Sequence, residues 1–113
     1  MKKIEAKIRK SKFKMVKKAL IESGFDSFNY NLTRCMSKES EKRYYRGVEF
    51  DSIAAERIDF AIYVEDKNVQ SVLEIILESG NSGDAYDSYI GVLDVSQAYI
   101  IEQVEGKDKL IRI

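Results

Sequence analysis

The sequence predicts an α+β domain in which two β-α-β halves, residues 1–34 and 57–95, flank a long polar loop. Two patterns carry this prediction. In several short segments apolar and polar residues alternate with the period of two that a half-buried strand requires. Between these segments, apolar residues recur every three or four positions in two stretches, as on the buried face of a helix. The resulting β-α-β-β-α-β order is that of the ferredoxin-like, split βαβ fold, and 113 residues form a single domain.

The first half contains a strand, a helix and a second strand. The apolar positions of the first strand are Ile4, Ala6 and Ile8. Ser11 is the expected N-cap of the helix, and Gly24 is expected to end it, because serine and glycine are favoured at these two positions. The apolar face of the helix consists of Phe13, Val16 and Leu20. The second strand is indicated by the alternation of Phe28, Tyr30 and Leu32 with polar residues.

The second half repeats this order. Its strand has the cleanest alternation in the chain, with Ile58, Phe60, Ile62 and Val64. Asp66 is the expected cap of the second helix, and Gly80 is expected to close it. The helical face consists of Val69, Val72, Leu73, Ile76 and Leu77. A fourth strand is expected through Tyr89, Ile90, Val92 and Val95, and a fifth over 98–104; the remainder, 105–113, is polar until its last residues.

The predicted sheet has helices on one face only, so its second face needs a cover. Depending on the register, that face carries Tyr30 or Tyr63. Oligomerisation is the economical way to cover it. The loop between the halves, about residues 35–56, is also unusual, because roughly 20 residues without a periodic apolar pattern are uncommon in a compact domain unless they have a function. We expect this loop to be an arm that contacts a partner.

Composition excludes several functions. Lys plus Arg and Asp plus Glu number 19 each, so no net charge draws the chain to nucleic acid. The absence of histidine excludes a histidine metal site and imidazole catalysis, and the single Cys35 cannot form an internal disulfide, which suits the cytoplasm. No apolar run approaches the ~20 residues of a membrane span, so direct membrane insertion is not expected. No nucleophile–base pair is evident, so neither catalytic nor metal-ligating residues are predicted.

The first 18 residues are strongly basic. Their cations are Lys2, Lys3, Lys7, Arg9, Lys10, Lys12, Lys14, Lys17 and Lys18. This charge fits a solvated strand edge and helix face, or a surface for an anion or an acidic partner. Farther along, Ser82-Gly83-Asp84 fits either a simple turn or a cradle of backbone N–H groups for an anion. Arg46-Gly47 with Phe50 partly matches the basic-glycine-aromatic strand motif of RNA-recognition domains. Asp51 and Ser52, however, break the aromatic pattern of that motif.

Several segments, taken with their spacing, resemble the PII family of trimeric nitrogen and carbon regulators. The opening residues 1–6 and the helical stretch 16–24 are similar to the family's first strand and helix. The segment Tyr45-Arg46-Gly47-Val48-Glu49-Phe50 resembles a segment of the family's T-loop. Arg57 falls on a family lysine, Ser82-Gly83 on the threonine-glycine of its B-loop, and Asp87 on its aspartate. The likeness extends over almost the whole chain.

The chain departs from the family pattern at its ligand sites. Phe50 replaces the tyrosine that some members uridylylate, so that modification cannot occur there. The residues 35–39 replace a glycine-rich stretch and the glutamine that helps to hold magnesium and 2-oxoglutarate. Tyr89, Ile100 and Glu102 replace three cations of the nucleotide cleft. The loss of three such cations removes on the order of 4–9 kcal/mol of binding free energy. This is comparable with the ~8 kcal/mol that a micromolar site provides. The family modes for 2-oxoglutarate and triphosphate are therefore weakened or absent.

The resemblance implies a cytoplasmic, homotrimeric, non-enzymatic regulator in nitrogen-related signal transduction. A small-molecule effector, with an adenine nucleotide (ATP, ADP or AMP) as the candidate, would bind by an altered mode in clefts between subunits. The implied ligand-binding residues are Ser82, Gly83, Asp87, Tyr89 and Arg57.

The T-loop, about residues 35–56, would contact a transporter or metabolic enzyme through Tyr45, Arg46, Gly47 and Glu49. Further implied segments are the B-loop, about 80–88, and a C-terminal segment, about 98–113. Arg46, Arg57 and the tail cations Lys107, Lys109 and Arg112 are candidates to replace the lost cations.

A second interpretation is a ligand-independent trimeric docking protein with a vestigial nucleotide site.

Overall fold

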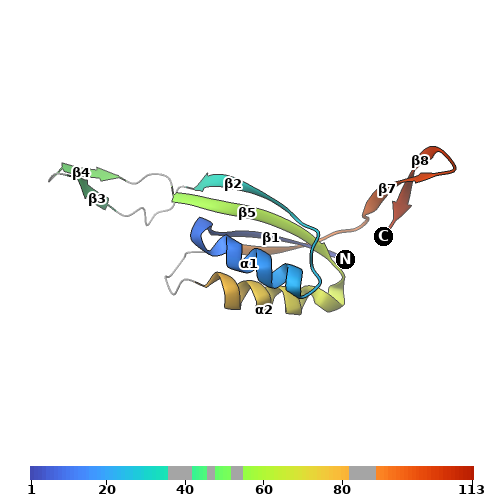
Figure 1. Ribbon diagram of the computed structural model, residues 1–113, viewed down its shortest axis with the longest axis horizontal. Coiled ribbons are helices and arrows are strands. Elements are labelled where there is room, and N and C mark those ends of the chain that lie inside the picture. Colours follow the sequence, from blue (N-terminus) through green and yellow to red (C-terminus); the bar gives the residue numbers. More distant parts are fainter. Residues whose placement is uncertain (36–41, 46–47, 52–54, 82–88) are drawn as a thin grey trace.

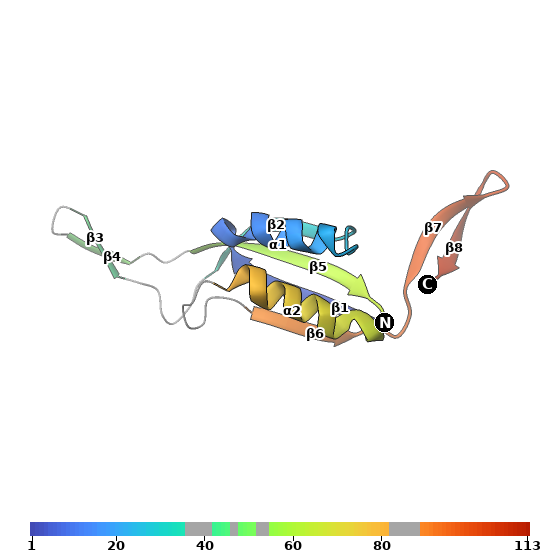
Figure 2. The same ribbon diagram turned by 60° about the horizontal axis from the view of Figure 1, so that its bottom comes forward.

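Two helices cover one face of a four-stranded antiparallel sheet in the computed structural model, which describes residues 1–35, 42–45, 48–51, 55–81 and 89–113 (Figure 1). The strand order in the sheet is β2-β5-β1-β6. The elements of this body are β1 (Lys2–Arg9), α1 (Lys10–Glu22), β2 (Asn29–Cys35), β5 (Ala55–Val64), α2 (Val69–Gly80) and β6 (Tyr89–Asp94). The predicted β-α-β-β-α-β order is therefore confirmed. Both helices lie on the same side of the sheet in the turned view as well (Figure 2).

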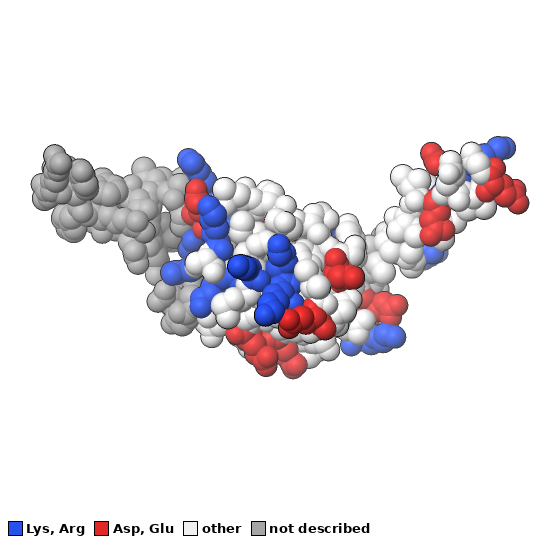
Figure 3. All heavy atoms as spheres, in the orientation of Figure 1, with Lys and Arg blue, Asp and Glu red and all other residues white. Residues whose placement is uncertain are grey.

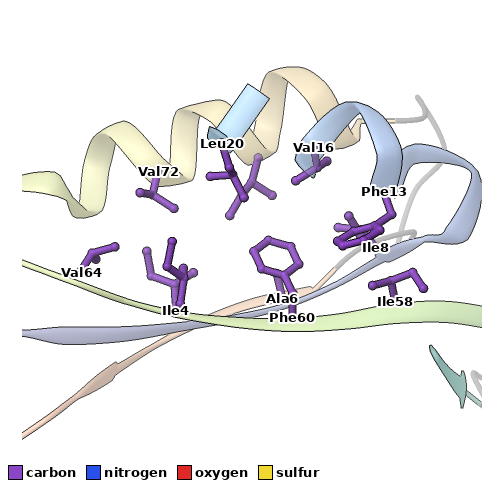
Figure 4. Packing of buried hydrophobic residues seen from close by; sticks show 12 residues of the cluster. Ile4, Ala6, Ile8, Phe13, Val16, Leu20, Ile58, Phe60, Val64 and Val72 are labelled. Atoms are coloured by element: carbon purple, nitrogen blue, oxygen red, sulfur yellow. The ribbon is translucent and has the colours of Figure 1, made fainter. Parts of the chain in front are cut away.

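The core lies between the helices and the two central strands. The register places Ile4 opposite Ile62 and Ala6 opposite Phe60, so the apolar alternations of β1 and β5 face the same way. The buried side chains pack in one layer beneath the helices (Figure 4). They are Ile4, Ala6, Ile8, Phe13, Val16, Leu20, Ile58, Phe60, Ile62, Val64, Val72 and Ile76. The predicted helical faces are confirmed except at Leu77, which is 61% exposed because it lies beyond the edge of that face.

The register also decides which tyrosine lies on the second face of the sheet. Tyr30 is opposite the buried Phe60, and its ring centroid lies 4.7 Å from that of Phe13, so it is on the helical side. Tyr63 alternates with buried residues of β5 and is half exposed on the other side. Of the two candidates, Tyr63 is therefore the one on the face that no helix covers. We call this face the open face.

Neither predicted N-cap is correct. α1 begins one residue before Ser11, directly after β1, and no side chain caps its N-terminus. Asp66 lies in a 3₁₀ turn, η1 (Asp66–Asn68), and α2 starts only at Val69. The predicted helix ends are confirmed. Gly24 follows α1 with φ +88, a conformation that disfavours other residues.

Gly80 is the last residue of α2, and its lack of a side chain matters for packing. A Cβ atom at this position would lie 3.2 Å from a methyl group of Val16. The small residue therefore allows α2 to approach α1 closely where the helix ends.

Two hairpins were not expected from the sequence pattern. The first, β3 (Lys42–Tyr45) with β4 (Val48–Asp51), forms a separate two-stranded sheet within the expected loop. The second pairs the predicted fifth strand, β7 (Tyr99–Val104), with β8 (Lys107–Arg112) in the polar remainder. Figure 1 shows the two hairpins at opposite ends of the body. No helix in the described ranges is long and apolar enough to cross a membrane.

Asp66 holds the N-terminus of the chain instead of capping α2. The terminal ammonium lies 2.7 Å from its Oδ1 atom, and this hydrogen bond and charge lower the pKa of Asp66. Since the pKa is lower in the folded state, the pair stabilises the fold above the unfolded pKa of about 4 and is lost as pH falls. We expect Asp66→Asn to reduce stability at pH 7 more than at about pH 3, measured by urea denaturation.

An Asp26→Asn variant is the control, because that aspartate is also exposed and follows α1, whereas the terminal ammonium pairs with Asp66. Equal effects of Asp66→Asn at both pH values would contradict the assignment.

Candidate functional site

The open face has a basic end, where β2 and β5 lead toward the β3–β4 hairpin. Lys7 and Arg9 of β1 face away from the helices, because the intervening Ile8 is buried beneath them. Arg57 of β5 lies directly opposite Arg9, and Tyr89 of β6 lies directly opposite Lys7. The topology therefore brings the predicted ligand residues Arg57 and Tyr89 to the same end of the open face, on the two strands that flank β1.

The geometry of this end suits an oxyanion. Directly opposite residues on neighbouring strands have Cβ atoms about 4.5–5.5 Å apart, so the side chains of Arg9 and Arg57 start from neighbouring positions on the open face. Thr33 lies opposite Arg57 on its other side and adds a hydroxyl group. Arg57 also donates a hydrogen bond from Nη1 to the backbone oxygen of Glu56, at 3.1 Å. Two arginines and a threonine at neighbouring positions of one face are residue types that bind a phosphate or carboxylate well.

Three residues of this basic end were missed as ligand residues by the sequence analysis. The sequence pattern identifies Lys7 and Arg9 only as members of the basic start of the chain. Thr33 is one of the polar residues that alternate with Phe28, Tyr30 and Leu32. The alternation in β1 places Lys7 and Arg9 on the open face. Their partners, however, follow only from the strand register, which the sequence pattern does not specify.

The structure describes only some of the other predicted site residues. Ser82, Gly83 and Asp87 lie outside the described residues, as do Arg46 and Gly47 of the loop. Tyr45 is the last residue of β3 and pairs with Val48, and Glu49 of β4 pairs with Tyr44. These two loop residues therefore belong to the β3–β4 hairpin, which is not part of the main sheet.

The C-terminal cations do not reach the basic end within one chain. Lys107, Lys109 and Arg112 lie on β8, and Lys109 pairs across the hairpin with Glu102 of β7. The hairpin extends from the end of the body opposite to the β3–β4 hairpin (Figures 1 and 2). Within one chain these three cations therefore lie away from Arg9 and Arg57, at the other end of the body.

A hollow on the helical side offers a different chemistry. It lies between the end of α1 and α2 and is lined by Ser23, Phe25, Ser71, Glu74, Ile75 and Glu78. Its two carboxylates and lack of a cation make it unsuited to a phosphate. No group of three or more His, Cys, Asp or Glu side chains comes together in the part of the chain that the structure describes.

Comparison with known proteins agrees with this architecture. The family model "Nitrogen regulatory protein P-II" matches residues 1–105. A relative from Porphyra purpurea with that name is 33% identical over 98 residues, which cover 86% of this chain and 88% of the relative. Relatives of the same name from Microchaete diplosiphon and Pasteurella multocida are 30% and 29% identical over 112 residues, covering 98% of this chain and 100% of each relative.

Proposed function

Because the chain belongs to the nitrogen regulatory protein P-II family, we propose that it is a trimeric sensor whose loop controls a target protein in response to a small anionic effector. Proteins of this family are regulators rather than enzymes, and they act as trimers that bind targets. The observation that carries the proposal is the position of Arg57 beside Arg9, at the end of the sheet from which the loop starts. An anion bound at that end lies where it can influence the loop.

The open face supports the proposed trimer. Tyr63 and Leu93 lie on either side of Lys3 on this face, and their side chains are 52% and 44% exposed. Contact between the open faces of three copies would cover this apolar end. It would also bring the basic end of each copy close to a neighbour, and the cations of a neighbour's β8 become available to the cleft.

The effector is proposed to be an adenine nucleotide that binds by an altered mode. Arg57 and Arg9 would contact its phosphate groups, and Tyr89, which is 65% exposed on the same face, would stack on its base. Ser82, Gly83 and Asp87 complete the proposed cleft.

The loop is proposed to respond to the effector and to contact a transporter or metabolic enzyme. Its contacts would be made through Tyr45, Arg46, Gly47 and Glu49. Control of a target requires that the effector binds more tightly to one arrangement of the loop than to another. The cytoplasm is the proposed location.

Calorimetry tests the sensor. We expect saturable heat with at least one of ATP, ADP and AMP and none with 2-oxoglutarate, because residues 35–39 replace the family's stretch that carries the amide ligand. Arg57→Gln should weaken the nucleotide about tenfold or more, since a hydrogen bond to a charged group contributes about 1.5–3 kcal/mol. Lys67→Gln, on η1 and far from the basic end, is the matched control and should leave the affinity unchanged.

A second candidate function is favoured by the replacement of three family cations by Tyr89, Ile100 and Glu102. In that case the chain is a ligand-independent trimeric docking protein with a vestigial nucleotide site. Flat calorimetric traces with ATP, ADP, AMP, cyclic dinucleotides and bicarbonate, from a sample that light scattering shows to be trimeric, would contradict the sensor and support the docking protein.

A further inference from the structure

Helix α1 carries a stripe of lysines on its surface. Its 13 residues, KSKFKMVKKALIE, include five lysines and one acidic residue, Glu22. Four of these lysines have the spacing i, i+4, i+7, i+8 and therefore share one side of the helix. We call Lys10, Lys14, Lys17 and Lys18 the α1 stripe. The buried side of the helix, with Phe13, Val16 and Leu20, lies toward the core.

The stability of the helix does not explain the stripe. The positive end of the helix dipole favours acidic residues in the first turn, but α1 has none there and begins at Lys10. Lys14 is four residues from both Lys10 and Lys18, and like charges at this spacing are destabilising. In the described part of the chain, Lys10 has one ion pair, with Glu56 at 3.4 Å, and Lys18 has one with Glu22 at 3.9 Å.

The stripe lies on the side of α1 that is remote from α2. Lys10 reaches Glu56 of β5, and the Lys17 ammonium lies 5.9 Å from the ring centroid of Tyr30 on the edge strand β2. α2 has the opposite charge, because it carries Glu74 and Glu78 and no cation. In Figure 3 the basic side chains gather over the part of the surface that α1 occupies in Figure 1. An anionic partner can therefore approach the stripe without meeting the carboxylates of α2.

The chemistry of the stripe indicates the partner. It consists of lysines alone, whereas interfaces between proteins are depleted in lysine and enriched in arginine. The hollow on the helical side is lined by residues other than these lysines, so it does not place a small anion on the stripe. Met15 and Ile21 are 55% and 48% exposed beside the stripe, and such side chains can enter the headgroup region of a bilayer. We propose that the α1 stripe binds the surface of an anionic membrane.

This binding is peripheral and electrostatic. A lysine close to an anionic bilayer strengthens binding about fivefold, and the attraction falls as salt rises. The four lysines act additively only if they reach the surface together, which their common side of the helix allows. The proposal does not depend on the proposed sensor function, because neither an effector nor a target protein takes part.

Vesicle sedimentation with the full chain tests the proposal. We expect the protein to sediment with vesicles containing about one third phosphatidylserine at low salt, and to remain in solution with pure phosphatidylcholine. Lys14→Glu with Lys18→Glu should reduce the affinity for the anionic vesicles about a hundredfold or more. The matched control is Lys67→Glu with Lys109→Glu, which changes the net charge equally outside α1 and should change the affinity less than about threefold. Circular dichroism of both variants monitors folding.

Three results would overturn the proposal. They are equal binding to neutral and anionic vesicles, an equal loss in the control variant, and no sedimentation of the wild-type chain with anionic vesicles at low salt. In the last case, retention of the wild-type chain on an immobilised acidic peptide, lost in Lys14→Glu with Lys18→Glu, would assign the stripe to a protein partner instead.

Discussion

Replacing Phe60 by alanine is expected to lower the free energy of unfolding by about 3–5 kcal/mol. Phe60 is 2% exposed in the central strand β5, and its ring lies 6.3 Å from that of Phe13 and 6.1 Å from that of Phe28, measured between centroids. The substitution leaves a cavity where strand, helix and loop meet. Because small domains have stabilities of about 5–15 kcal/mol, the loss is a large fraction of the total.

Urea denaturation followed by circular dichroism measures this loss. The protomer concentration must be the same for each variant, because association into the proposed trimer would contribute to the apparent stability. Ile21→Ala is the control, since Ile21 is 48% exposed on α1 and its truncation should change stability by less than about 1 kcal/mol. Similar effects of the two substitutions would show that the layer beneath the helices is not the core.

Charging the apolar end of the open face should dissociate the proposed trimer. Tyr63 and Leu93 both lie opposite Lys3, whose ammonium is already 2.8 Å from Glu5 Oε1. Tyr63→Glu with Leu93→Glu would surround one lysine with three carboxylates. Burying unpaired charges costs several kcal/mol, so association should weaken by a factor of more than about a hundred.

Light scattering measures this effect directly. The wild-type chain should have a mass near three protomers and the charged variant a mass near one. Met15→Glu with Leu77→Glu is the matched control, because these exposed apolar side chains lie on the helices and not on the open face. A monomeric wild-type chain would refute the trimer and the shared cleft together. A trimeric charged variant would refute only the assignment of the interface.

The body of the fold could be predicted because its apolar pattern has a clear period. Ile4, Ala6 and Ile8 alternate without interruption, and this alternation is decided by burial on one face. The helix starts could not be predicted in the same way. Ser11 and Asp66 have side chains that commonly cap helices, but β1 leads directly into α1, and Asp66 pairs with the N-terminus.

The β7–β8 hairpin was missed although its turn has a local signal. Glu105 and Gly106 have φ values of 53 and 78, as in the two-residue turns that connect twisted strands. The polar composition of β8 hid the strand, because a strand that is largely exposed has no apolar alternation. The basic end of the open face was hidden for another reason. Arg9 and Arg57 are far apart in the sequence, and only the pairing of β1 with β5 makes them neighbours.

The hairpin at the C-terminus has a consequence for biosynthesis. Ile101 and Leu110, which pair across it, are 73% and 68% exposed, and a two-stranded ribbon by itself is marginally stable in water. A newly synthesised chain therefore displays two large apolar side chains on a weakly stable ribbon. Exposed apolar side chains on such a ribbon promote aggregation, and this hazard rises with the concentration of the chain.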